Sequence, residues 1–464
     1  MSSSDSSSDN EAAEETDLIY YLPLQRAIRK DEWDVATRFV EADPDAVGAI
    51  LSAEAETPLI LAAKQGPRSN HFLARLLELM TPDQVAQRDN TGTTALHAAA
   101  MHGNISGVQL LLRSQPALTN IPNKVGDLPL HLAAAHGHRK TVRFLFGLTR
   151  YDVEPNPYQG GHGAALMRYA MNARFYDIAI SILQRHPTSA WQGFSPLDVL
   201  AQEPSAFRSG SKLNTLQHLL YSCVPMEIEN VPLAVNGDDA ENTVSQKLYA
   251  TLWKFLEIIV PHMKSIRVTK SLHCQAVQLV KCLCEKLLNS SDADKRCSRS
   301  IRLAAKFGID EIVGEILGRS SYAHTFFDED GRSALHLAVM YRHENVFNSI
   351  VNGLSAGNRK FLLESLDNKG NNILHLAGYR AQQQQLDLVS SAVLQMQHEL
   401  QWFKVNVVTC LNVSTSFFSV DCVRVTYTLK VEGYLGVAYT LLSMSLRAVL
   451  DNTTDASTDC KRKA

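Results

Sequence analysis

The sequence predicts an all-α solenoid built from repeated helix-turn-helix units. Three observations support this fold class. A Leu-His motif followed by small residues recurs along the chain, its strong copies form pairs spaced 34 and 39 residues apart, and glycine and turn residues return at the same place in the copies. Self-similarity with a period of about 20 to 50 residues is typical of repeat architectures, in which each unit packs on its neighbours.

The Leu-His motif occurs in four strong copies and five weaker ones. The strong copies begin at Thr94, Leu128, Ser333 and Asn372. Their histidines are His97, His131, His336 and His375. The weaker copies begin at Leu22, Thr57, Ala165, Ser195 and Ser300. We therefore expect two blocks of repeats, one over residues 20–203 and one over residues 296–404, the second ending in a long helix.

The start of each motif predicts the first helix of a unit. A hydroxyl such as that of Thr94 can accept hydrogen bonds from the free N–H groups at a helix start, and Pro129 occupies a position where proline costs no helical hydrogen bond. Small residues such as Ala98 and Ala99 keep one side of the helix thin, so neighbouring helices can approach closely. Glycines that are expected to end these helices in a left-handed conformation are Gly66, Gly103, Gly137 and Gly308.

A second helix and a projecting turn complete each unit. Apolar residues at helical spacing, as in Val108, Leu111 and Leu112, give the second helix one side to bury. Between units, the segments DNTG from Asp89 and NKVG from Asn123 supply turn-forming residues. Each unit is therefore predicted to be a helix, a second helix and a projecting turn.

The recurring Thr-Pro-Leu-His-x-Ala pattern, with a period of about 33 residues, resembles the ankyrin repeat. This resemblance implies that His97, His131, His336 and His375 hydrogen-bond within and between repeats, and do not bind a metal or act in catalysis. Their position also argues against a shared metal, because histidines of successive stacked units lie about one repeat apart. We expect no cofactor and no metal site.

Three longer segments resemble a narrower family, the plant ankyrin-repeat proteins whose C-terminal membrane domain opens with a Pro-Gly-Gly motif. These are the accelerated-cell-death and increased-tolerance-to-salt proteins. The segments that carry the resemblance are Leu252 to Cys284, Leu366 to Gly378 and Ala392 to Lys404. The resemblance implies a signalling protein of plant defence or stress responses that is associated with the plasma membrane and works through protein contacts.

Other parts of the chain lack the repeat pattern. Residues 1–19 form an acidic, Ser-rich start that is expected to be disordered. Residues 204–245 mix Ser, Gly, Pro and Asn, which predicts a loop or disordered insert. Residues 246–290 carry apolar positions at helical spacing and predict a helical insert that packs on the neighbouring repeats.

The tail over residues 405–464 departs from the family. It contains no proline, and its longest uncharged stretches have 16 and 14 residues, whereas a membrane helix needs about 20. We expect the Pro-Gly-Gly membrane domain to be missing, through a truncated isoform or a gene model that read into non-coding sequence. The protein is then expected in the cytoplasm or at the periphery of a membrane. Anchoring through residues 405–449 remains the alternative.

Composition and motifs argue against an enzyme or a nucleic-acid binder. The chain carries 45 Lys and Arg against 48 Asp and Glu, a formal charge of −3, and no strongly basic domain of the kind that binds nucleic acid. The glycine cluster Gly160 to Gly163 lacks the spacing of a dinucleotide-binding loop. Cys282 and Cys284 have no second spaced pair to complete a zinc site.

The remaining hypothesis is that the protein is an adaptor that binds other proteins. The projecting turns and the exposed side of the first helices form the surface that we call the concave face, and extended concave surfaces are how solenoids bind proteins. Self-association, or association with full-length membrane-anchored relatives, is a further expectation. The candidate contact residues are Asn90, Thr91, Met101, His102, Asn123, Lys124, Ala135 and His136.

Overall fold

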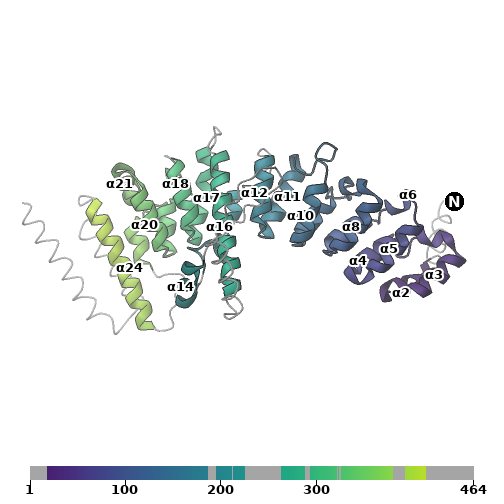
Figure 1. Cartoon of the computed structure of the whole chain (residues 1–464). Helices are drawn as coiled ribbons and strands as arrows, with labels where there is room; N and C mark the ends of the chain where they lie inside the picture. The colour runs from purple at the N-terminus through teal and green to yellow at the C-terminus, as the bar shows by residue number, and fades with distance from the viewer. Residues whose placement is uncertain are drawn as a thin grey trace, which may run out of the picture. The chain divides into compact units, whose positions relative to one another are not determined.

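A computed structural model describes residues 18–186, 195–211, 213–224, 263–287, 293–320, 322, 325–379 and 392–413. These residues form helices joined by turns, with no strand among them, which confirms the predicted all-α solenoid (Figure 1). The chain divides into two compact units, Met1–Pro196 (unit 1) and Leu197–Ala464 (unit 2). Residues 1–17 of the acidic start predicted over residues 1–19, and the tail from residue 414 onward, lie outside the described residues, whereas residues 18 and 19 are helical and correct the end of that prediction.

Unit 1 consists of helix pairs that follow one another along the chain (Figure 1). The first helices of the pairs are α2 (Leu22–Lys30), α4 (Pro58–Lys64), α7 (Ala95–Met101), α9 (Pro129–Ala135) and α11 (Gly160–Asn172). The second helices are α3 (Trp33–Ala42), α5 (Asn70–Leu79), α8 (Ile105–Ser114), α10 (Arg139–Leu148) and α12 (Tyr176–Arg185), with the short helix α6 (Pro82–Val85) after α5.

The first helices stack closely because their sides are thin. Helix α7 packs against α4 on one side and α9 on the other. Its residues Ala98, Ala99 and Ala100 have no solvent exposure. The second helices supply the larger apolar side chains, such as Val108 and Leu111 of α8, which are also fully buried. Each repeat therefore completes its core only with the help of its neighbours.

In α7, α9 and α19 (Ala334–Met340) the motif histidine links the helix to the next repeat. His97 lies at 0% exposure, and its Nδ1 accepts a hydrogen bond from the N–H of Thr94 at 3.2 Å. Its Nε2 donates to the carbonyl oxygen of Asp127 in the next repeat at 3.1 Å. His131 and His336 make the same two kinds of contact, to the carbonyl oxygens of His162 and Ser365. The ring is thereby fixed as the neutral Nε2–H tautomer.

Burial keeps these rings neutral. Desolvation lowers the pKa of His97 from 6.5 to about 4, against the opposing effect of the hydrogen bond to Asp127. Burial likewise lowers the pKa of His131 and His336. His375 makes the same contact within its own repeat, where its Nδ1 accepts from the N–H of Asn372 at 3.2 Å.

Gly103 ends α7 in a position that only glycine fits. Its φ is +67°, and a Cβ atom there would lie 2.4 Å from Nδ1 of His138. His138 approaches so closely because its Nε2 donates to the carbonyl oxygen of Met101 at 2.8 Å. Unit 2 repeats the arrangement with Gly308 and His343, whose Nε2 donates to the carbonyl oxygen of Lys306 at 3.0 Å. A second inter-repeat hydrogen bond thus lies beside the one from the motif histidine.

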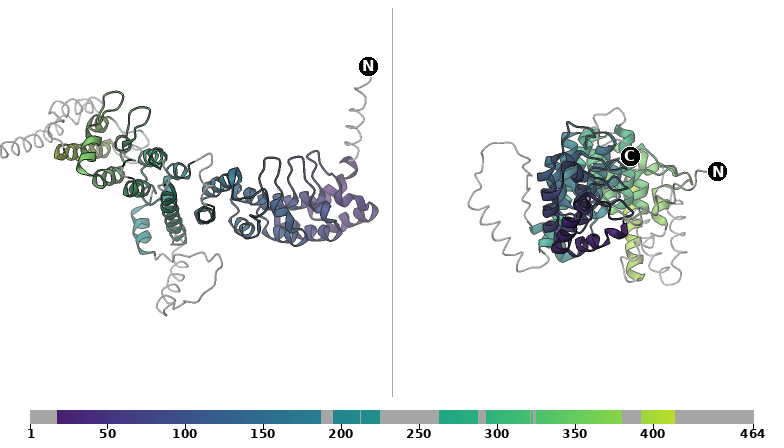
Figure 2. Two further views of the ribbon diagram at one scale, coloured as in Figure 1. Left: turned by 90° about the horizontal axis from the view of Figure 1, so that it is seen from above. Right: turned by 90° about the vertical axis from the view of Figure 1, so that its right-hand side faces the viewer.

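The turns between repeats project from one side of the helix stack in unit 1 (Figure 2, left). Successive turns are joined by backbone hydrogen bonds. Asn90 donates to the carbonyl oxygen of Glu54, and Lys124 donates to that of Thr91, both at 2.9 Å. These bonds hold the turns in register and give the concave face a regular spacing.

Unit 2 continues the same pattern around an insert. Its first helices are α13 (Pro196–Leu200), α17 (Ala293–Phe307), α19 (Ala334–Met340) and α22 (Ile373–Gly378). The other helices are α14 (Thr215–Cys223), α16 (Met263–Leu287), α18 (Asp310–Arg319), α20 (Glu344–Gly353), α21 (Ala356–Glu364) and α24 (Ala392–Val413). Helix α16 packs against α18, as α18 packs against α20, so the long helix of the insert takes the place of a second helix.

Helix α14 corrects part of the predicted loop over residues 204–245. The N–H of Asn214 donates to Oε1 of Gln217 at 3.0 Å, which caps the helix start. Tyr221 is buried, and its hydroxyl shares a hydrogen bond of 3.0 Å with Nδ1 of His273 on α16. A helix this short depends on tertiary packing, which the local composition does not reveal. Residues 225–262 lie outside the described part of the chain.

Helix α24 also extends past the predicted boundary at Lys404 and ends at Val413. No proline or glycine follows Lys404 in this stretch to stop the helix. Within the described ranges, no helix combines the length and the apolar character that crossing a bilayer requires.

A buried ion pair fixes α24 to the last repeats. Nε and Nη2 of Arg342 bind the two carboxylate oxygens of Glu399 at 3.0 and 2.9 Å, and both side chains are 4% exposed. Arg342 has a φ of +61° and stands at the motif position that Gly103, Gly137 and Gly308 occupy in their repeats. Its guanidinium also donates to the carbonyl oxygens of Val339 and Tyr379, so one side chain joins the C-terminal ends of α19 and α22 to α24.

The stacking of the first helices can be tested at Ala99. We expect Ala99→Leu to lower the free energy of unfolding by about 1 to 3 kcal/mol, because the fully buried site has no room for a larger side chain. Urea denaturation followed by circular dichroism measures the change. Ala135→Leu, at an exposed alanine of α9, is the matched control and should leave the midpoint nearly unchanged. A wild-type midpoint for Ala99→Leu would contradict the assignment of this helix side.

The neutral histidines predict a loss of stability in acid. Unfolded His97 takes up a proton near pH 6.5, whereas the folded ring does so only near pH 4. Stability from this site is therefore complete above pH 6.5 and falls as the pH drops toward 4, by about 2 kcal/mol at pH 5. Urea titrations at pH 7 and pH 5 should show that His97→Gln is less stable than wild type at pH 7 but loses less on acidification. Equal losses would show that His97 does not contribute to the pH dependence.

Candidate protein-interaction surface

The turn residues of the predicted surface differ in how their side chains are used. Nδ2 of Asn90 donates to the carbonyl oxygen of Ala53 at 2.9 Å. The hydroxyl of Thr91 donates to Oδ1 of Asp89 at 2.6 Å. Oδ1 of Asn123 accepts the backbone N–H groups of Val125 and Asp127 at 3.0 and 2.8 Å. These three side chains hold the turns in shape, although Asn90 and Thr91 are exposed.

Lys124 is the turn residue whose side chain remains available. It is exposed, and its ammonium group makes no hydrogen bond or ion pair with any residue that the structure describes. The adjacent Val125 is 85% exposed at the tip of the same turn. A cation and an apolar side chain therefore stand together at the end of this turn.

The four helix residues of the predicted surface lie at the C-terminal ends of α7 and α9. Met101 is half-buried, and its carbonyl oxygen is held by His138. His102 is exposed, but its Nδ1 contacts the carbonyl oxygen of Ala98 at 2.9 Å, within hydrogen-bond distance. Ala135 and His136 are exposed. The structure thus places the eight predicted residues on two neighbouring turns and the ends of the two helices beneath them.

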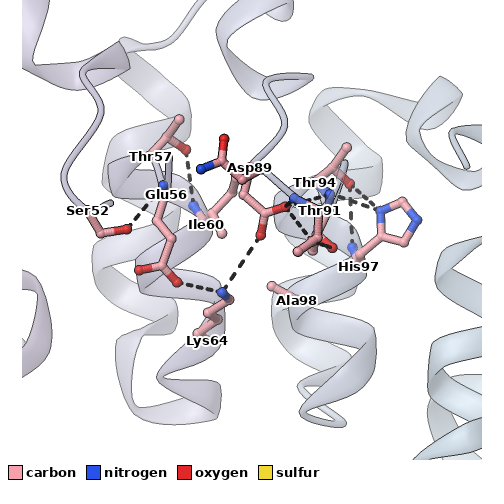
Figure 3. A network of polar contacts seen from close by, with 12 residues as sticks. Ser52, Glu56, Thr57, Ile60, Lys64, Asp89, Thr91, Thr94, His97 and Ala98 are labelled. Atoms are coloured by element: carbon pink, nitrogen blue, oxygen red, sulfur yellow. Dashed lines mark hydrogen bonds and ion pairs between the residues drawn. The ribbon is translucent and has the colours of Figure 1, made fainter. Parts of the chain in front are cut away.

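A charge network lies on the same surface one repeat earlier (Figure 3). Nζ of Lys64 lies 2.5 Å from Oε1 of Glu56 and 3.9 Å from Oδ2 of Asp89. Asp89 also accepts the N–H groups of Thr91 and Thr93 at 2.9 and 2.8 Å. Lys64 is thereby matched by two carboxylates of its own unit, and the network stabilises the turn.

Sequence reasoning missed three residues of this surface. Val125 is exposed beside Lys124, and its place inside the turn motif could have identified it. Arg168 and Tyr169 belong to α11, the next first helix, and the Tyr169 hydroxyl donates to Oδ2 of Asp127 at 3.4 Å. The weak motif copy from Ala165 hid these two, because it has Arg168 in place of the motif histidine and Tyr169 in place of the residue that follows it.

The described residues show no group of His, Cys, Asp or Glu side chains that could hold a metal ion. The glycine cluster at Gly160 lies in the first turn of α11. The surface exposes Lys124, Val125, Ala135 and His136 on a regular frame of turns.

Comparison with known proteins gives one family. A family model described as ankyrin repeats, in three copies, matches residues 24–123 and 59–158. These ranges cover the first helices α2, α4, α7 and α9 with the turns between them.

Relatives among characterised proteins match over short stretches. Human inversin is 40% identical over 83 residues, which cover 18% of this chain and 8% of inversin. The Arabidopsis thaliana E3 ubiquitin-protein ligase KEG is 32% identical over 121 residues, or 24% of this chain and 7% of that protein. The Drosophila melanogaster tyrosine-protein kinase Shark is 26% identical over 248 residues, or 48% and 24%. The chain thus spans under a quarter of the length of each of these proteins.

The family match, the motif copies and the stacked helix pairs agree over the same part of the chain. Solenoids of this kind bind other proteins through extended concave surfaces. The chain contains ankyrin repeats and folds as an all-α ankyrin-repeat solenoid.

Proposed function

We propose that the protein is a non-enzymatic adaptor that binds a partner protein through the concave face of unit 1. The observation that carries this proposal is the group of exposed side chains on two adjacent repeats. Lys124 and Val125 stand on one turn, with Ala135 and His136 on the helix that follows it. The backbone hydrogen bonds between turns hold this group in place before a partner arrives, which lowers the entropic cost of binding.

The contact residues divide into two classes by their geometry. Lys124, His136 and Met101 can meet a partner without loss of internal hydrogen bonds. Asn90 bonds to the preceding turn at Ala53, and Asn123 holds its own turn, so we propose that they act by positioning their neighbours. The partner is expected to be a protein surface with carboxylates opposite Lys124 and apolar groups opposite Val125.

We further propose a role in plant defence or stress signalling, on the basis of the resemblance of residues 252–284, 366–378 and 392–404 to the plant family. Partners of such signalling proteins would then bind the concave face of unit 1. Anchoring through residues 405–449 is the second candidate, and it rests on the membrane association of the same family.

The adaptor surface can be tested with a triple variant, Met101→Ala, His102→Ala and Lys124→Glu. We expect it to lose the partners that the wild-type chain recovers by cross-linking and mass spectrometry from its native tissue, with a melting temperature close to wild type. The control variant, Arg113→Ala, Lys140→Glu and Leu148→Ala, changes exposed residues of the second helices α8 and α10 and should keep those partners. Retained partners in the triple variant would refute the proposed surface, and a large loss of stability would show that the chosen residues are structural.

The two candidate locations can be separated by fractionation. The tagged full-length chain and a version that ends at Val413, where α24 ends, are extracted from membranes with alkaline carbonate. We expect both to be released, because the uncharged stretches of the tail are shorter than a membrane span. Resistance of the full-length chain alone would favour anchoring through residues 405–449.

A further inference from the structure

Unit 2 contains an open pocket of about 320 Å³ on its own concave face, formed by two successive turns and the first helices behind them. The volume is at the lower end of the range for ligand sites. The residues that line it are Arg332, Met340, Asp367, Lys369, Asn371, Leu376 and Tyr379. All of them belong to the described part of unit 2, and none belongs to the surface proposed for unit 1.

One side of the pocket is apolar. Met340 ends α19, Leu376 lies on α22, and Tyr379 follows α22 directly. The Tyr379 side chain is well exposed, and its hydroxyl donates to Oδ1 of Asn371 at 3.3 Å. This hydrogen bond orients the ring beside the two aliphatic side chains and leaves an apolar surface open to solvent.

The carboxylate of the pocket is already satisfied. Oδ1 of Asp367 accepts the backbone N–H groups of Lys369 and Asn371 at 2.9 and 2.8 Å, and Oδ2 accepts Nδ2 of Asn371 at 3.1 Å. Burial acts to raise the pKa of Asp367, but these hydrogen bonds outweigh it and hold the pKa below its usual value. Asp367 is therefore a fixed, charged part of the turn.

The basic groups of the pocket keep unused donors. Nη1 of Arg332 binds Oδ2 of Asp330 at 2.6 Å, but its enclosed Nε makes no hydrogen bond with the residues that the structure describes. Lys369 is exposed, and its ammonium group makes no ion pair within the described ranges. Lys64, on the concave face of unit 1, is instead held by Glu56 and Asp89. Of the two, Lys369 is the lysine whose charge is left for another molecule.

We propose that this pocket binds an extended acidic peptide segment of a partner protein. A carboxylate of the peptide would accept hydrogen bonds from Lys369 and from Nη2 of Arg332, since Asp330 binds Nη1. A neighbouring apolar side chain of the peptide would pack on Met340, Leu376 and Tyr379. Arg332 is paired with Asp330, and the oxygens of Asp367 already accept hydrogen bonds, so the ammonium group of Lys369 is the charge that complements an anion. The site goes beyond the proposed function, since it gives one chain a second, independent contact.

The test begins with a library of random octapeptides displayed on phage and selected on the full-length chain. We expect enrichment of sequences that place Asp or Glu within two residues of Leu, Met or Phe. The most enriched peptide is then synthesised with a fluorescent label, and its Kd is measured by fluorescence anisotropy. Lys369→Glu and Tyr379→Ala should each weaken binding about tenfold or more, because each removes one half of the recognition.

Three comparisons make the result specific to the pocket. Lys360→Glu introduces the same charge change at an exposed residue of α21 and should leave the Kd within a factor of about three. A peptide in which Lys replaces the enriched acid should bind Lys369→Glu better than wild type. The triple variant of unit 1 should bind the acidic peptide like wild type. Failure of the pocket thereby remains distinguishable from failure of the proposed adaptor surface.

The proposal is overturned by any of three outcomes. The first is a selection that enriches no sequence. The second is enrichment of Lys and Arg, which would mean that Asp330 and Asp367 dominate recognition. The third is binding of an acidic peptide that survives Lys369→Glu and is lost in the triple variant of unit 1. Should Lys369→Glu alter the circular dichroism spectrum, Lys369→Met removes the charge without introducing an acid and is expected to weaken binding in the same direction.

Discussion

Close stacking of the first helices is the constraint on which the rest of the structure depends. A helix pair cannot enclose a core by itself, so each repeat must bury its apolar side against the next. The fully buried Ala98, Ala99 and Ala100 make this approach close enough for His97 to reach the carbonyl oxygen of Asp127. The same spacing brings successive turns within backbone hydrogen-bond distance. The spacing of the turns on the candidate surface therefore depends on the small side chains of the first helices.

Much of the fold could be predicted from the sequence because each repeat carries its own local signals. The nine motif copies all coincide with first helices, including the weak copies from Leu22 and Ser195. Helix α14 could not be predicted, because it is stabilised by the contact between Tyr221 and His273, which are far apart in the sequence. The same holds for the role of Arg342, whose partner Glu399 lies 57 residues away. Local sequence patterns thus predict the repeats. Polar contacts between residues far apart in the sequence determine the position of α14 and of α24.

The candidate surface was predictable in position but not in chemistry. Place within the motif predicts which residues lie on turns and helix ends, because every unit has the same backbone. It does not predict whether a side chain is held by a neighbouring turn, as Asn90 is by the carbonyl oxygen of Ala53, or makes no bond with the described residues, as with the ammonium group of Lys124. The pocket of unit 2 depends on the same distinction, since Asp367 and Lys369 are two residues apart in one turn, but among the described residues only the carboxylate has bonding partners. Such differences are set by the neighbouring repeat.

The ion pair between Arg342 and Glu399 also has a consequence for how the gene can change. Repeat proteins gain and lose whole units, since each new unit offers the same faces as the one that it displaces. The repeat that holds Arg342 no longer has this property on its C-terminal side. A duplicated unit placed after it would separate the arginine from Glu399 and leave a buried charge without its counter-charge. Repeats can therefore be inserted before the repeat of Arg342, but not between that repeat and α24. The distance between Arg342 and α24 is thus fixed, although the array before it can lengthen.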